Sequence, residues 1–152
     1  MTVSKYDYLK TTEITRDTVY PPFINMIFYH LKDAPDDFEI RFTHVSVPFD
    51  GKEDPHAHDF PQVFVFVPCT EDLQAYDAET HLYLGEEGDK MVVSETCAVY
   101  VPAGLVHCPI IHVRVGTPFF FVNCPITPRY SAIIGGERLD VPLDPGKKLK
   151  TD

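Results

Sequence analysis

The sequence predicts a single all-β domain, built as a sandwich or a barrel of short strands. Three observations predict it: apolar or alternating segments recur at short intervals, turn residues separate them, and no helices are interleaved among them. The chain has 152 residues, of which 44% are hydrophobic and 14 are prolines. This length and composition suit one packed domain rather than a disordered chain.

Helical spacing occurs only near the N-terminus. We expect a helix over residues 22–31, where Phe23, Met26, Ile27 and His30 recur at helical spacing. A polar loop at residues 33–37 ends this pattern. Apolar and polar residues then alternate over residues 38–47, which predicts the first strand of the barrel, ended by Pro48.

The rest of the chain reads as strands separated by loops. The apolar run at residues 63–67 predicts a strand, and an acidic loop follows at residues 68–77. Further strands are expected at residues 79–84, 91–93, 98–101, 110–115 and 119–123. We therefore divide the chain into a partly helical extension (1–37), a barrel (38–124) and an irregular tail packed on the barrel or on a partner (125–152).

The strand at residues 63–67 is apolar on both faces. If its two phenylalanines point inward, then Val63, Val65 and Val67 point outward and need cover. An N-terminal segment or a second subunit would supply this cover, and we expect a homodimer.

Charge and targeting signals exclude several classes of partner. The formal net charge of −10 disfavours nucleic acids and anionic membranes. The N-terminus does not resemble a signal peptide, and no apolar stretch approaches the roughly 20 residues of a membrane span. We expect a cytoplasmic protein whose four scattered cysteines are reduced thiols.

Two short segments carry the histidines that suggest a metal site. His56 and His58 precede the strand at residues 63–67, so they share one face with Gln62 if the strand continues back to them. Two adjacent imidazoles suit a first-row transition metal, and the Pro-Ala-Gly turn before His107 is placed to deliver a third. Cys108 follows His107, and strand alternation predicts that its side chain points away from the site.

These segments resemble the two sequence motifs of the cupin superfamily. His56 and His58 match the H-x-H of the first motif, and Pro102, Gly104 and His107 match the central P-x-G-x-x-H of the second motif. The sequence departs from the pattern in four ways: only four residues separate Gly51 from His56, Gln62 stands in the glutamate position, Thr96 replaces a glycine and Ile111 replaces an asparagine. The resemblance covers roughly residues 38–124 and is closest to small single-domain bacterial members.

The resemblance implies a jelly-roll barrel, or double-stranded β-helix, that holds a metal. His56, His58 and His107 take the ligand positions, and Gln62 takes the position of the carboxylate. Because an amide is a weaker ligand than a carboxylate, Gln62 either binds through its oxygen or hydrogen-bonds to water in the site. A three-histidine centre of this kind suits Fe(II), Mn(II), Ni(II), Cu(II) or Zn(II) and leaves positions for a substrate or dioxygen.

Other polar residues are candidates for the surroundings of the metal. His81 and Tyr83 share a face of the strand at residues 79–84, and either is a candidate second-shell partner or general acid or base. Arg41 and His44 lie on opposite faces of their strand, so at most one lines the pocket. An inward Arg41 would imply an anionic substrate, but we favour an outward, solvated side chain. Asp59 is expected to be a surface or loop-anchoring acid.

The sequence therefore suggests a small metal-dependent enzyme that acts on a small organic molecule. Dioxygenase-like oxidation competes with isomerase or lyase chemistry, including decarboxylation. The alternative is a non-catalytic cupin that binds a small ligand or mediates assembly, with a structural metal or none. Substrate and reaction do not follow from the fold, because one barrel hosts many chemistries.

Overall fold

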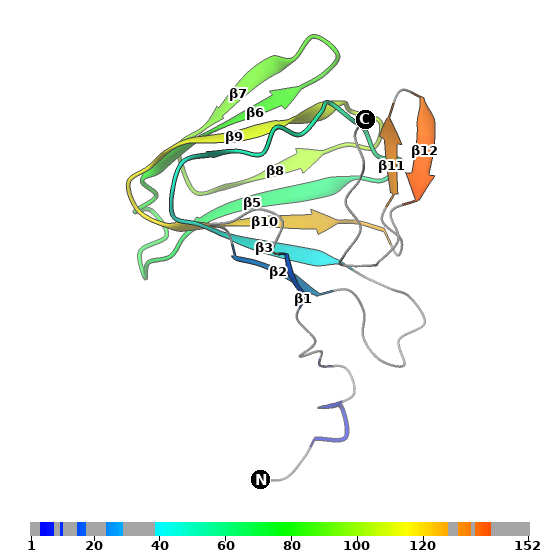
Figure 1. Cartoon of the computed structure of the whole chain (residues 1–152). Helices are drawn as coiled ribbons and strands as arrows, with labels where there is room; N and C mark the ends of the chain where they lie inside the picture. The colour runs from blue at the N-terminus through cyan, green and yellow to red at the C-terminus, as the bar shows by residue number, and fades with distance from the viewer. Residues whose placement is uncertain are drawn as a thin grey trace.

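The computed structural model describes residues 4–7, 10, 15–17, 24–28, 39–127, 131–134 and 136–140. Within these residues every regular element is a β-strand, and the strands form two antiparallel sheets and a separate hairpin (Figure 1). The predicted all-β class is confirmed. Across the same residues, no helix has the length and apolar character needed to cross a bilayer.

The larger sheet has six strands in the order β1-β2-β3-β10-β5-β8. These strands are β1 (Thr15–Asp17), β2 (Ile24–Phe28), β3 (Ile40–Val45), β10 (Phe119–Pro125), β5 (Gln62–Pro68) and β8 (Cys97–Val101). The smaller sheet has four strands in the order β4-β9-β6-β7. They are β4 (Phe49–Asp50), β9 (His107–Val115), β6 (Ala78–Leu84) and β7 (Asp89–Val93).

The core lies between the two sheets, which face each other across the barrel (Figure 1). Strand β5 alternates strictly between buried and half-buried residues, as expected for a strand with one face on the core. Both sheets supply the buried apolar cluster, which consists of Val45, Phe64, Phe66, Ala78, Leu82, Val93, Val101 and Phe119. Full burial of each larger side chain contributes about 1.5–3 kcal/mol to folding.

The helix expected over residues 22–31 is wrong at its centre. Residues Ile24–Phe28 form β2, which pairs with β3 from Ile24 opposite His44 to Phe28 opposite Ile40. A short, mostly apolar segment fits either a helix or a strand, and here the pairing with β3 decides the outcome. The remaining residues of the expected helix lie outside the described part of the chain.

The tail is not irregular throughout. Strands β11 (Ser131–Ile134) and β12 (Glu137–Asp140) form a hairpin. Gly136 in its turn has a φ of 83°, a conformation that glycine adopts without strain. The hairpin is tied to the barrel at Ala57, whose backbone exchanges two hydrogen bonds with Ile133, at 3.2 and 2.7 Å. Residues 141–152 lie outside the described part.

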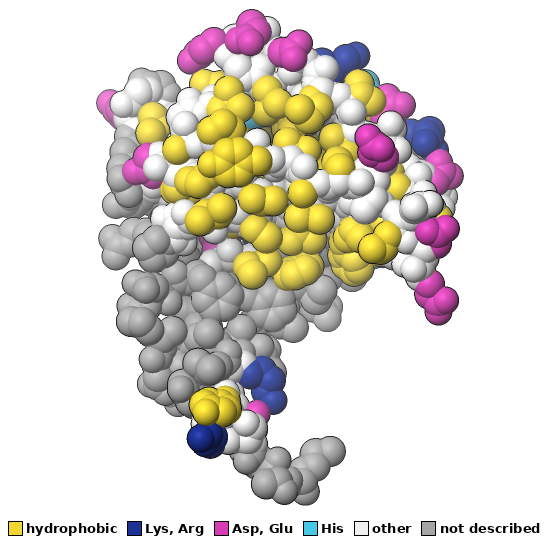
Figure 2. Space-filling view, turned by 180° about the vertical axis from the view of Figure 1, so that it is seen from behind, with side chains coloured by type: hydrophobic (Ala, Val, Ile, Leu, Met, Phe, Trp, Pro, Cys, Tyr) yellow, Lys and Arg dark blue, Asp and Glu magenta, His cyan; other side chains and the backbone are white. Residues whose placement is uncertain are grey.

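The outer face of the larger sheet is apolar. Val63, Val65 and Val67 are half-buried there, as their alternation with the buried residues of β5 predicts. The neighbouring strand β8 adds Tyr100, whose side chain is 61% exposed. Figure 2, a view from behind Figure 1, shows hydrophobic side chains gathered over this broad face. A second subunit as its cover stays a prediction, and so does the division of the chain at residues 37 and 124.

Candidate metal centre

The three predicted histidine ligands come together at one end of the barrel. Their ring centroids are 5.0 Å apart for His56 and His58, 4.7 Å for His56 and His107, and 5.2 Å for His58 and His107. His58 and His107 are each 2% exposed, and His56 is half-buried. The two motifs, which are far apart in sequence, thus form a single cluster of imidazoles.

Backbone hydrogen bonds hold the two motifs against each other. The amide of His56 donates to the carbonyl of His107 at 3.0 Å, and the amide of His107 donates to the carbonyl of His56 at 2.9 Å. In the turn before His107, the amide of Gly104 donates to the carbonyl of His58 at 2.8 Å. Gly104 has a φ of 81°, which strains any residue with a Cβ. The backbone conformation of the turn therefore explains why the third position of P-x-G-x-x-H is glycine.

Each histidine is oriented by a hydrogen bond from its Nδ1 to a backbone carbonyl. The acceptor is Asp54 for His56 at 2.7 Å, Ser131 for His58 at 2.5 Å, and Leu105 for His107 at 2.9 Å. A carbonyl oxygen only accepts, so Nδ1 carries the proton in all three neutral rings. The lone pair is then on Nε2. Metal-binding histidines are commonly held in one tautomer in this way, by a hydrogen bond from the ring nitrogen that does not bind the metal.

The surroundings keep the buried imidazoles neutral. Burial lowers the pKa of His58 to about 4, although its hydrogen bond to the Ser131 carbonyl acts in the opposite direction. Burial also lowers the pKa of His107, while the Glu53 carboxylate opposes this shift. Neutral imidazole is the form that binds metal, so at neutral pH these two rings do not need to lose a proton first.

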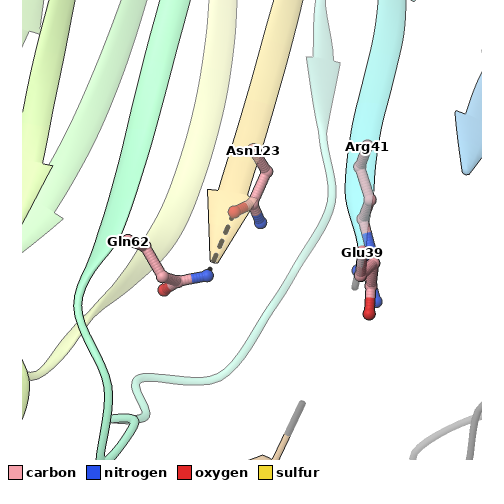
Figure 3. Close-up of polar contacts among 4 residues, drawn as sticks. All are labelled: Glu39, Arg41, Gln62 and Asn123. Atoms are coloured by element: carbon pink, nitrogen blue, oxygen red, sulfur yellow. Dashed lines mark hydrogen bonds and ion pairs between the residues drawn. The ribbon is translucent and has the colours of Figure 1, made fainter. Parts of the chain in front are cut away.

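Gln62 lies on the inner face of β5 and is 1% exposed. Its Nε2 donates to Oδ1 of Asn123 on β10 at 3.1 Å (Figure 3). Its Oε1 is buried and has no hydrogen-bond partner among the described residues. An unsatisfied buried acceptor costs about 1–3 kcal/mol, so this oxygen is suited to receive a bond from a ligand. Ligation of a metal by Gln62 stays a prediction.

Arg41 faces inward, contrary to our expectation of a solvated side chain. It lies opposite Asn123 and on the same face of β3 as the fully buried Val45. Its Nε donates to the carboxylate of Glu39, which is 5% exposed, and Figure 3 shows this pair beside the Gln62–Asn123 pair. His44 contacts Phe120 on the outer face, so only Arg41 of the two lines the barrel interior.

Cys108 does not point away from the histidines as strand alternation predicted. It has a φ of 85°, and this left-handed backbone breaks the regular alternation of β9 at its second residue. Among the described residues, the ligand atoms of His56, His107 and Cys108 all lie within 4.8 Å of one another, in a group that does not include His58. The Cys108 thiol donates to Oε2 of Glu53 at 3.3 Å.

His81 and Tyr83 lie away from this cluster. Strand β6 buries Ala78, Thr80 and Leu82, so the alternate residues His81 and Tyr83 face outward from the smaller sheet. Nε2 of His81 is bonded to Glu79 at 2.7 Å on that outer face. This placement argues against the expected roles of both residues as second-shell partners or general acids or bases.

Sequence reasoning missed residues that come from distant segments. Ser131 supplies its carbonyl to His58 from a hairpin 73 residues away, and its hydroxyl donates to Asp59 at 3.3 Å. Asp59 therefore anchors this hairpin, in keeping with the role expected for it. Asn123 could have been found from the sequence, because it stands two residues after Phe121 and four after Phe119, and alternate residues of a strand share one face.

The sequence matches no protein-family model and no curated protein. Solved structures do resemble it. The Fe(II) form of HppE has a TM-score of 0.51 at 11% identity, over 75% of this chain, which spans only 56% of HppE. The polyketide cyclase RemF from Streptomyces resistomycificus has a TM-score of 0.51 at 18% identity, over 86% of this chain and 81% of RemF. Both are cupin-fold proteins, so this chain adopts the cupin-type β-barrel fold that its two histidine motifs predicted.

Proposed function

We propose that this protein is a metal-dependent cupin enzyme that acts on a small organic molecule. The observation that supports it best is the arrangement of His56, His58 and His107, in which each Nδ1 is bonded to a carbonyl and each Nε2 is left to bind a metal. The donor set fits a divalent ion such as Fe(II), Mn(II), Ni(II), Cu(II) or Zn(II). When bound, such an ion would polarise a substrate oxygen or take part in dioxygen chemistry.

The protein's own polar groups near the histidines favour an oxygen-containing substrate. The orphaned Oε1 of Gln62 accepts a hydrogen bond from a substrate hydroxyl group, which compensates for its burial. Arg41 adds a cationic group on the same wall, balanced by Glu39. Phe64, whose ring centroid lies 6.0 Å from that of His107, supplies an apolar surface. One apolar surface with a few converging polar groups is typical of small-molecule sites.

Two reaction classes are compatible with this arrangement: dioxygenase-like oxidation and isomerase or lyase chemistry. Isomerases and lyases need a base that moves a proton, and Gln62 in the carboxylate position cannot serve as one. This substitution favours the oxidative class. The second class stays a candidate, because RemF, which has a similar fold, is a polyketide cyclase.

Metal analysis of the purified protein tests the metal centre first. After expression in metal-supplemented medium, we expect close to one ion per chain by plasma mass spectrometry. The variants His58→Ala and His107→Ala should lose it, whereas His81→Ala, an imidazole on the outer face, should keep it. Less than roughly 0.2 ions per chain in the unmodified protein would contradict the proposal, since imidazole centres bind tightly.

A second measurement separates the enzyme from a ligand-binding module. The metal-loaded protein is incubated aerobically and anaerobically with a library of small hydroxy acids, diketones and phenols, and consumption is followed by mass spectrometry. Turnover that ceases in His107→Ala supports the enzyme. Saturable binding of a library member without turnover, under both atmospheres, would support the non-catalytic alternative.

A further inference from the structure

The candidate centre lacks a negative charge where the cupin pattern places one. Gln62 is neutral, and its amide group is engaged by Asn123 through Nε2. Three neutral imidazoles and an amide leave the two positive charges of a divalent ion without compensation in a buried site. Burying uncompensated charge is unfavourable, so an anionic group from elsewhere would strengthen metal binding considerably.

An ionisable sulfur lies beside the histidines. The Sγ of Cys108 and the ring nitrogens of His56 and His107 form a group within 4.8 Å, and Cys108 is 4% exposed. The left-handed φ of 85° turns this side chain from the expected outer face towards the imidazoles. A non-glycine residue in this conformation is uncommon and points to a constraint from its surroundings.

A proton acceptor for the thiol is also in place. Sγ of Cys108 donates to Oε2 of Glu53 at 3.3 Å, and Glu53 belongs to the exposed loop just before His56. This carboxylate therefore contacts the thiol on one side and solvent on the other. It provides a route by which a proton leaves the buried sulfur.

We propose that Cys108 is a further protein ligand of the metal, bound as a thiolate. As the sulfur–metal bond forms, the S–H bond breaks and its proton passes to the Glu53 carboxylate and then to water. The charge missing at Gln62 is thereby supplied from β9. This inference rests on the proposed metal centre and narrows it to ions that accept sulfur, such as Fe(II), Co(II) or Zn(II), over Mn(II).

Cobalt substitution tests the assignment with a readout other than activity. The metal-free protein is titrated with Co(II) and followed by absorption spectroscopy. We expect visible ligand-field bands together with a near-ultraviolet thiolate-to-cobalt charge-transfer band, and release of about one proton per ion in weak buffer. Cys108→Ser should bind Co(II) more weakly, with loss of the charge-transfer band. Cys124→Ser, on the outer face of β10, should leave the band unchanged.

The outcomes separate this inference from the proposed function. Co(II) bound without a charge-transfer band, or with a band that survives in Cys108→Ser, overturns the role of Cys108 and leaves the histidine centre intact. Failure to bind Co(II) at all overturns both. X-ray absorption of the zinc-loaded unmodified protein needs no variant: a Zn–S distance of about 2.3 Å supports the proposal, and a shell of nitrogen and oxygen alone overturns it.

Discussion

His112 makes the stability of this fold depend on pH. Its side chain is 6% exposed in the barrel interior, and its ring centroid lies 5.4 Å from that of Phe119. Burial lowers the pKa of His112 from 6.5 to about 4. The unfolded chain therefore takes up a proton below pH 6.5 that the folded chain takes up only near pH 4. Stability contributed by neutral His112 is complete above pH 6.5 and is lost as the pH falls.

The size of the effect follows from this shift. One pKa unit corresponds to about 1.36 kcal/mol, so the whole shift is worth about 3 kcal/mol in the limit of low pH. Between about pH 7 and pH 5, linkage removes about 2 kcal/mol of unfolding free energy through this residue alone. His112→Gln cannot titrate, so its loss over the same interval should be smaller by that amount.

Urea unfolding of the metal-free protein at several pH values measures the difference. Thr80→Val is the matched control, because it removes the hydroxyl that is bonded to His112 Nδ1 at 2.9 Å and leaves the ring buried. Burial causes the shift, so this variant should keep the pH dependence of the unmodified protein. Equal pH dependence in His112→Gln and the unmodified protein would refute the reasoning. If His112→Gln does not fold, His112→Leu serves the same comparison.

Two further predictions concern Gly104, in the turn before His107, and the side-chain amide of Gln62. Gly104→Ala places a Cβ at a φ of 81° and should destabilise the protein by about 1 kcal/mol in urea unfolding, whereas Gly51→Ala, outside the left-handed region, should change stability by less than about 0.5 kcal/mol. Equal destabilisation by Gly104→Ala and Gly51→Ala would contradict the importance of the left-handed conformation of Gly104 for the turn. Gln62→Glu should destabilise the metal-free protein by about 1–3 kcal/mol, because it buries a carboxylate, and should tighten metal binding in chelator competition. Unchanged affinity would show that position 62 does not act on the ion.

The histidine cluster was predictable because it depends on local rules. The spacing of His56 and His58 and the turn that precedes His107 are both contained in short segments. The antiparallel pairing that joins them is a general property of the fold that the motifs indicate. The alternation of β5 was predictable for the same reason: the strand is apolar on both faces, and placing Gln62 inside with the histidines fixes which of its residues point inward.

The errors arose where a face or a partner depends on distant chain segments. Arg41 shares its face of β3 with Thr43 and Val45, and the more apolar face, with Ile40 and Phe42, turns outward. The inward position of Arg41, beside Asn123 and Glu39, therefore does not follow from the polarity of this strand. The face of His81 could not be assigned from the sequence, because the burial of Thr80, which pairs with His112, cannot be read from β6 alone. A left-handed residue such as Cys108 has no sequence signal when it is not glycine.

The number of protein ligands bears directly on whether this centre is catalytic. Three histidines leave positions open on either a tetrahedral or an octahedral ion, but a fourth ligand from Cys108 would complete a tetrahedral zinc site and close it. A six-coordinate Fe(II) or Co(II) ion would keep two positions for substrate under the same four ligands. The proposed thiolate thus makes the identity of the metal decide between the two functions: zinc favours the structural, non-catalytic centre, and iron favours the enzyme.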